Sequence, residues 1–133
     1  MSQDHSGGCH CGALRYRVQA TLDDVAHCHC SICRRCSGGT ITTWATAPLA
    51  SFTWTQGQPR SYHSSATCTR YFCPNCGAQL ALFTTRSPDS IDITIATLDD
   101  PEQVAVRRHI WVGTRLHWLH LDPQLPEERE ESY

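Results

Sequence analysis

The stretch Cys28-His29-Cys30-Ser31-Ile32-Cys33-Arg34-Arg35-Cys36 decides how this chain is interpreted, because it places four thiols within nine residues. A buried cysteine that only packs behaves as a small hydrophobe and gains nothing from thiol neighbours. A zinc ion, in contrast, binds sulfur ligands in a tetrahedron at about 2.3 Å. The C-x-C-x2-C-x2-C spacing therefore predicts a metal site.

Two further thiol pairs bracket this stretch. Cys9 and Cys11 precede it, and Cys73 and Cys76 follow it in a C-x2-C-G pattern typical of a zinc knuckle. Four thiolates fill a zinc tetrahedron and leave no position for a substrate, so this set predicts a structural zinc site. Because its halves lie more than sixty residues apart, the binding energy of the metal would become folding energy.

The central stretch leaves two alternatives open. Cys28, Cys30 and Cys33 supply three thiolates, and three protein ligands with one open position are typical of catalytic zinc. Cys36 follows three residues later, on the same face of a helical turn, and as a fourth ligand it would close the site. Beside an open site, Arg34 and Arg35 are candidates to bind the carboxylates of an anionic ligand.

The bulk composition excludes several classes of protein. The chain has 133 residues, 40% hydrophobic and 18% charged, which indicates a single globular domain. A formal net charge of −2 gives no electrostatic footprint for nucleic acid. No apolar run is long enough for a membrane span, and the first residues lack a hydrophobic signal core. We therefore expect a cytoplasmic protein that contacts neither nucleic acid nor membrane. Its nine cysteines would be reduced there, and their dense clusters would bind metal rather than form disulfides or redox-active thiols.

The alternation of apolar and polar residues predicts a mainly β fold. Within the first predicted strand, Leu14, Tyr16 and Val18 would face the core. Residues 31–36 would form one short helical turn with Ser31 as N-cap and Gly38 and Gly39 at its end. The four tryptophans are expected to pack in the core or at its edge. The expected strands are residues 13–18, 40–45, 51–55, 60–64, 67–72, 78–84, 91–96, 104–112 and 115–121.

Taken in order, these motifs resemble the glutathione-dependent formaldehyde-activating enzyme family, whose domain is shared with centromere protein V. The resemblance spans residues 7–126 and leaves 127–133 as an acidic tail that we expect to be solvated. The residues that carry it are Gly8-Cys9-His10-Cys11-Gly12-Ala13 with Tyr16, Cys28-His29-Cys30-Ser31-x-Cys33-Arg34-Arg35, Ser64-Ser65, Arg70-x-Phe72-Cys73-x2-Cys76-Gly77, His109-Ile110 and Trp118.

The resemblance implies a single-domain β-tent of antiparallel sheets with two zinc ions. It assigns Cys9, Cys11, Cys73 and Cys76 to a structural zinc, and Cys28, Cys30 and Cys33 to a catalytic zinc. It further implies a carbon–sulfur lyase that resembles S-(hydroxymethyl)glutathione synthase and acts on glutathione, or a similar small thiol, and a small aldehyde. The sequence departs from the family at Cys36, where a small residue or threonine is usual, and before His109, where a proline is common.

Two other functions compete with a lyase. A non-catalytic module that binds zinc and a thiol or a protein would use the same fold, since fold alone does not set function. An enzyme similar to methionine sulfoxide reductase would need a free, reactive thiol, for which Cys36 and Cys68 are the spare candidates.

Overall fold

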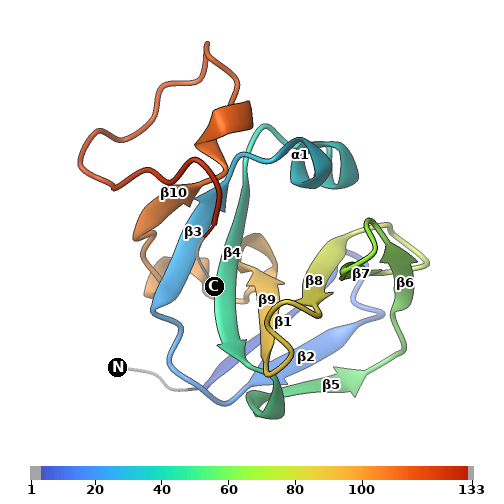
Figure 1. The fold of residues 1–133 in the computed structure, drawn as a ribbon. Coiled ribbons are helices and arrows are strands. Elements are labelled where there is room, and N and C mark those ends of the chain that lie inside the picture. Colours follow the sequence, from blue (N-terminus) through green and yellow to red (C-terminus); the bar gives the residue numbers. More distant parts are fainter. Residues whose placement is uncertain (1–3, 132–133) are drawn as a thin grey trace.

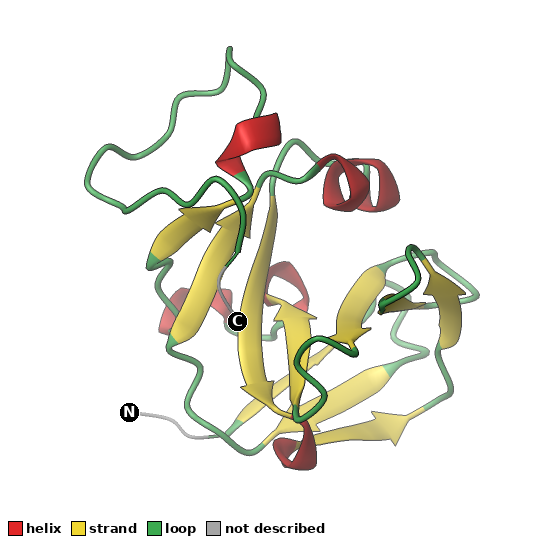
Figure 2. Ribbon diagram, viewed as in Figure 1, coloured by secondary structure: helices red, strands yellow, loops and turns green. Residues whose placement is uncertain are grey.

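The computed structural model describes residues 4–131 and contains two sheets, one of three strands and one of seven (Figures 1 and 2). The three-stranded sheet has the order β1-β2-β5, and the seven-stranded sheet has the order β10-β3-β4-β9-β8-β7-β6. All neighbouring strands are antiparallel except β10, which runs parallel to β3. The strands are β1 (His5–Gly8), β2 (Arg15–Val18), β3 (Asp24–Cys28), β4 (Thr42–Pro48), β5 (Phe52–Gln56), β6 (Arg60–His63), β7 (Cys68–Phe72), β8 (Gln79–Thr84), β9 (Ser90–Thr94) and β10 (Arg108–Ile110). The helices are α1 (Ser31–Ser37) and the 3-10 turns η1 (Leu49–Ser51), η2 (Ile95–Thr97), η3 (Pro101–Gln103) and η4 (Val112–Thr114).

The main core lies between the two sheets. As predicted, Leu14, Tyr16 and Val18 are all but inaccessible to solvent, and the Tyr16 ring packs on Phe52 and Trp54 of β5. Because side chains alternate across a strand, the seven-stranded sheet sends its other residues to the opposite face. That face holds a second buried cluster: Ala26, Cys28, Cys33, Trp44, Leu82 and Ile110.

The short helix α1 begins and ends close to where the sequence predicts it. Its N-cap is Cys30 rather than Ser31, because the Cys30 Sγ accepts a hydrogen bond from the Cys33 N–H at 3.1 Å. Gly38 ends the helix in the left-handed conformation, with φ of 74°. The Cys30 thiol thus caps the helix and also belongs to the predicted metal-binding motif, so one side chain determines both the start of α1 and the position of a candidate metal ligand.

Of the nine predicted strands, one is wrong and one is present only in part. Residues 115–121 form turns and loop, and of the predicted strand 104–112 only β10 is extended in a sheet. Strands β1 and β3 were not predicted, because each has few residues and is dominated by glycines or by the start of the cysteine stretch. The mainly β, single-domain prediction is confirmed.

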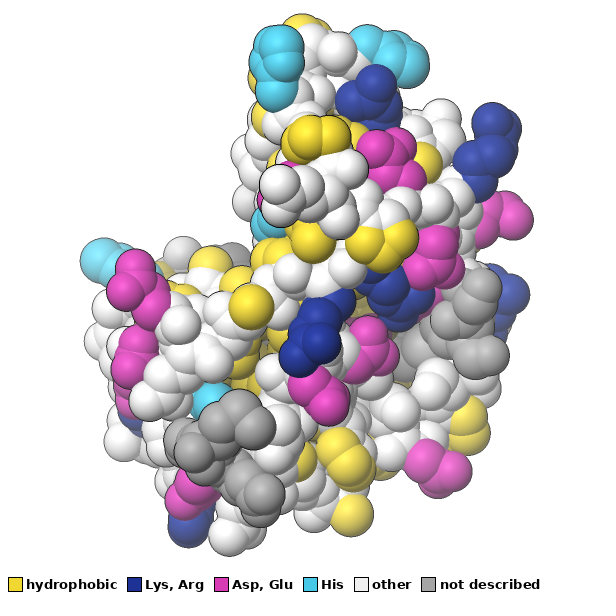
Figure 3. Space-filling view, turned by 90° about the vertical axis from the view of Figure 1, so that its left-hand side faces the viewer, with side chains coloured by type: hydrophobic (Ala, Val, Ile, Leu, Met, Phe, Trp, Pro, Cys, Tyr) yellow, Lys and Arg dark blue, Asp and Glu magenta, His cyan; other side chains and the backbone are white. Residues whose placement is uncertain are grey.

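The segment after β10 projects from the body as a long loop at the top of Figure 1, over residues 115–126. Trp118 is 67% exposed, so its predicted packing in the core or at its edge is wrong. Figure 3 shows histidine and hydrophobic side chains on this projection. Within residues 4–131, no helix has the length and apolar character needed to cross a membrane.

The chain then returns to β10, where two acidic side chains of the tail are partly buried, while Glu127 and Glu130 are exposed to solvent as expected. The His109 N–H donates to the Pro126 carbonyl at 2.8 Å, and the Glu128 N–H donates to the His109 carbonyl at 2.9 Å. The Glu128 and Glu131 carboxylates pair with Arg108 at 2.6 and 3.7 Å. An arginine on β10 thus replaces water as the partner of these two acidic side chains.

Candidate metal centres and cavity

Two turns from distant parts of the chain bring four thiols together. Cys9 and Cys11 lie in the turn between β1 and β2, and Cys73 and Cys76 lie in the turn after β7. Their four Sγ atoms lie within 4.8 Å of one another. The Cys9–Cys11 and Cys11–Cys73 separations are 3.6 and 3.7 Å, close to the edge of about 3.8 Å of a tetrahedron with 2.3 Å zinc–sulfur bonds.

Backbone N–H groups point at these sulfurs. The Leu14 N–H donates to the Cys9 Sγ at 3.2 Å, and the Asn75 and Cys76 N–H groups donate to the Cys73 Sγ at 3.4 Å. Hydrogen bonds from backbone N–H groups, first from Ala78, lower the pKa of Cys76 to about 6. Such donors favour thiolates, the form that binds metal, so this group fits a closed four-thiolate centre.

The second group contains the three thiols Cys28, Cys30 and Cys33, whose Sγ atoms also lie within 4.8 Å of one another. Cys28 ends β3, Cys30 caps α1, and Cys33 lies one turn into the helix. The Cys28–Cys33 separation is 3.5 Å. Hydrogen bonds from the Cys28 and Cys33 thiols lower the pKa of Cys30 to about 3, while the same contacts raise the pKa of Cys28. This donor set fits a soft cation such as zinc.

Cys36 does not join this group. It is exposed on α1, and among residues 4–131 the cluster comprises only the three thiols before it. The open alternative therefore has the support of the geometry. Cys68 lies on β7 and is half-buried.

A cavity of about 320 Å³ opens beside the three thiols. Its walls come from α1, β3, β4, β7, β8, β9 and β10, and its middle is apolar, with Trp44, Leu82 and Ile110. Trp111, also in the wall, holds a left-handed backbone with φ of 59°, a conformation that costs a bulky residue about 1–2 kcal/mol and is frequent at functional sites. The cavity is wide enough for a small organic ligand.

Arg70 is the arginine that contacts the thiols, whereas the spacing of the motif predicts Arg34 and Arg35 as the arginines beside the site. Its buried guanidinium donates to the Cys33 Sγ at 3.4 Å, to the Ser64 Oγ at 2.8 Å and to the Gln79 Oε1 at 3.1 Å. Arg34 is half-buried and Arg35 exposed, and among the described residues the cavity wall includes neither. That Arg34 and Arg35 bind a ligand stays a prediction.

Behind the three-thiol loop lies a pair of buried histidines that sequence spacing did not link. The His29 Nε2 and His109 Nδ1 are 2.9 Å apart, and the His29 N–H donates to the Ile110 carbonyl at 3.0 Å. Burial, and then the neighbouring His109, lower the pKa of His29 to about 4, so this ring is neutral at pH 7. The pair ties the thiol loop to β10.

Comparisons with known proteins agree with this architecture. A family model described as "Glutathione-dependent formaldehyde-activating enzyme" matches residues 4–114. A Halomonas elongata protein named "Putative glutathione-dependent formaldehyde-activating enzyme" is 26% identical over 125 residues, which cover 87% of this chain and 80% of that protein. The crystal structure of a Rhodobacter sphaeroides protein superimposes with a TM-score of 0.62 at 23% identity, over 92% of this chain and 98% of the other. That last likeness concerns the fold alone.

Proposed function

The chain belongs to the glutathione-dependent formaldehyde-activating enzyme family, and from this premise we propose that it is a zinc-dependent carbon–sulfur lyase. Its substrates would be glutathione, or a similar small thiol, and a small aldehyde. The observation that carries the proposal is that Cys28, Cys30 and Cys33 converge at the wall of a cavity of about 320 Å³.

The two thiol groups would have different roles. Cys9, Cys11, Cys73 and Cys76 would hold a structural zinc, because four thiolates complete its coordination. Cys28, Cys30 and Cys33 would hold a second zinc on the cavity wall. When bound there, a zinc ion supplies an open coordination position that stabilises a ligand sulfur as thiolate, or a Lewis acid for the aldehyde oxygen.

The chain's own residues would prepare the reaction. The apolar walls, Trp44 and Leu82 among them, would exclude water from the aldehyde. Arg70 would offset the negative charge of three thiolates beside a dication. In the synthetic direction the thiol sulfur attacks the aldehyde carbon, a carbon–sulfur bond forms, and the thiol proton ends on the former carbonyl oxygen. Cleavage is the reverse.

Native mass spectrometry with and without glutathione tests the metal and the thiol together. We expect two zinc ions and a glutathione adduct in the unmodified protein, and one zinc ion and no adduct in Cys30→Ser. Exchange of ¹³C-labelled formaldehyde with S-hydroxymethylglutathione, followed by NMR, should then be faster with the protein than with Cys30→Ser. Two zinc ions without an adduct would instead favour the non-catalytic binding module.

A further inference from the structure

The cavity that begins at the three thiols ends among charged side chains that the lyase proposal does not use. Asp24, Asp92, Arg108 and Glu131 line this far end. A second hollow of about 170 Å³ shares all four of them and extends the space toward the turn before β9. The far end therefore has room for a polar group of a ligand.

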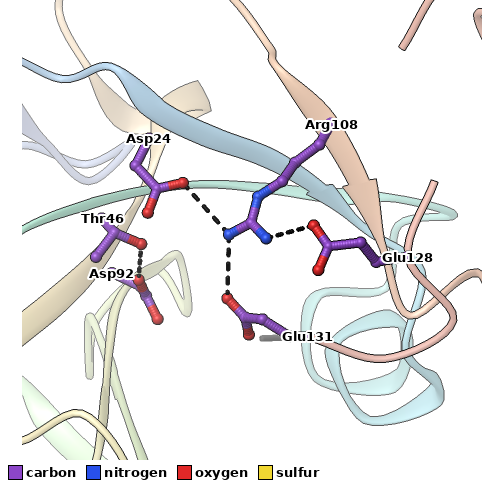
Figure 4. A network of polar contacts seen from close by, with 6 residues as sticks. All are labelled: Asp24, Thr46, Asp92, Arg108, Glu128 and Glu131. Carbon is purple, nitrogen blue, oxygen red and sulfur yellow. Dashed lines mark hydrogen bonds and ion pairs between the residues drawn. The ribbon is translucent and has the colours of Figure 1, made fainter. Parts of the chain in front are cut away.

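Asp92 is the unusual member of this set, because it lies on β9 inside the seven-stranded sheet. Its Oδ1 accepts a hydrogen bond from the Thr46 hydroxyl at 2.6 Å (Figure 4). Its Oδ2 accepts no hydrogen bond from residues 4–131. Burial raises the pKa of Asp92 to about 6, so the carboxylate is charged at pH 7 although its surroundings oppose the charge. Burial of this charge costs free energy, and a cationic partner at the Asp92 Oδ2 would offset that cost.

That partner is not the neighbouring arginine. The Arg108 guanidinium already pairs with Asp24 at 3.3 Å, Glu128 at 2.6 Å and Glu131 at 3.7 Å (Figure 4). Together with Asp92, four carboxylates surround this one guanidinium. Arg86 also lines the cavity, and the carboxylates still outnumber the two cations. The excess of negative charge favours a cationic group here.

The position of Asp92 sets the length of such a ligand. Cys28 lies opposite Thr42 on β4, and Asp92 lies opposite Thr46 on the other side of the same strand. Four residues along a strand span about 13 Å. Between the two ends the wall is apolar, with Trp44 and Leu82. A ligand that reaches both ends is elongated, with sulfur at one end and a cation at the other.

We propose that Asp92 is a specificity-determining residue that binds the ammonium group of an elongated aminothiol whose sulfur lies at the three-thiol centre. The sulfur end of this inference rests on the proposed function.

Calorimetry with two ligands tests the inference. The probes are glutathione and glutaryl-cysteinyl-glycine, which is glutathione without its ammonium group. We expect the zinc-loaded protein to bind glutathione at least about tenfold more tightly, as for a hydrogen bond between charged groups. In Asp92→Asn this preference should disappear because glutathione binding weakens, with zinc content and glutaryl-cysteinyl-glycine binding unchanged. Asp89→Asn, which alters an exposed carboxylate in the turn before β9, should bind both thiols as the unmodified protein does.

Each other outcome overturns a defined statement. Equal binding of the two thiols to the unmodified protein would refute the ammonium subsite and leave the lyase proposal standing. A preference that persists in Asp92→Asn would assign the ammonium group to another residue and refute the role of Asp92. Binding of neither thiol would refute the proposed function itself, and the inference with it. If Asp92→Asn does not fold, the two-ligand comparison on the unmodified protein still tests whether an ammonium subsite exists.

Discussion

Asp92 illustrates at the residue scale how a functional side chain opposes stability. Its pKa rises from 3.8 to about 6 in the folded protein because of burial, so the folded state holds a proton that the unfolded state has released. Stability from that proton is present below pH 4 and is lost as the pH rises to 6. Asp24 on β3 and Cys33 on α1 raise this pKa further, while the Thr46 hydroxyl on β4 and Arg108 on β10 lower it. Glu131, in the tail, lines the same hollow.

We therefore predict that Asp92→Asn is more stable than the unmodified protein at pH 7.5, by up to about 3 kcal/mol. This difference in the free energy of unfolding between the two proteins should be smaller by about 1 kcal/mol at pH 5, where the Asp92 carboxyl group is protonated. Urea unfolding of both proteins at the two pH values measures this, and metal loss common to both cancels in the difference. Asp89→Asn should be as stable as the unmodified protein at both pH values. If Asp92→Asn is more stable by the same amount at both pH values, the charge of Asp92 is not the cause of the difference.

Arg70 supports a second prediction at the residue scale. Arg70→Lys keeps the charge but loses the planar fork that reaches Cys33, Ser64 and Gln79 together. We expect zinc at the three-thiol centre to bind about 10- to 100-fold more weakly, as for other groups that orient metal ligands. Competition with a chromogenic chelator should show one zinc released more easily and one unchanged. Arg60→Lys, exposed on the neighbouring strand, is the matched control; release of both zinc ions in Arg70→Lys would mean general unfolding instead.

At the scale of the element, α1 depends on the same sulfur as the candidate metal centre. In Cys30→Ser the hydroxyl can still accept the Cys33 N–H, because serine is a favoured N-cap, but the soft ligand is gone. We predict that the protein loses one zinc ion and keeps its fold. Cys30→Ala should lose the same zinc ion and be less stable than Cys30→Ser by about 1 kcal/mol. Metal content and urea unfolding of the pair separate the two roles, and equal stability of the two variants would show that the cap contributes nothing.

The elements also show what sequence could predict. The three-thiol group was predictable from its short local spacing, and the four-thiol group because each of its two halves is a short local pair. Helix α1 was predictable from Gly38. Strand β1 was not predictable, because Gly7 is required there by a contact and not by a pattern: a Cβ at this position would overlap the Tyr16 hydroxyl. The places of Arg70 and Asp92 could not be predicted either, since they depend on the register of several strands.

At the scale of the whole molecule, the four-thiol centre joins the turn between the first two strands to the turn after β7. The first belongs to the three-stranded sheet and the second to the seven-stranded sheet. Removal of one ligand therefore acts on the packing of the two sheets, while the three-thiol centre joins only the end of β3 to the helix that follows it. The two centres should differ in what they hold together.

We predict that Cys76→Ser lowers the melting temperature by at least about 10 °C, because structural zinc contributes several kcal/mol or more to folding. Cys30→Ser, which also removes one zinc ion, should lower it by only a few degrees. Cys36→Ser, at an exposed thiol outside both groups, should change neither zinc content nor melting temperature. Thermal unfolding of the three variants, with zinc counted in each, measures this.

If Cys76→Ser and Cys30→Ser melt alike, the two centres do not divide into a structural and a catalytic site. If Cys36→Ser loses zinc, the three-thiol centre has a fourth ligand and no open position for a substrate.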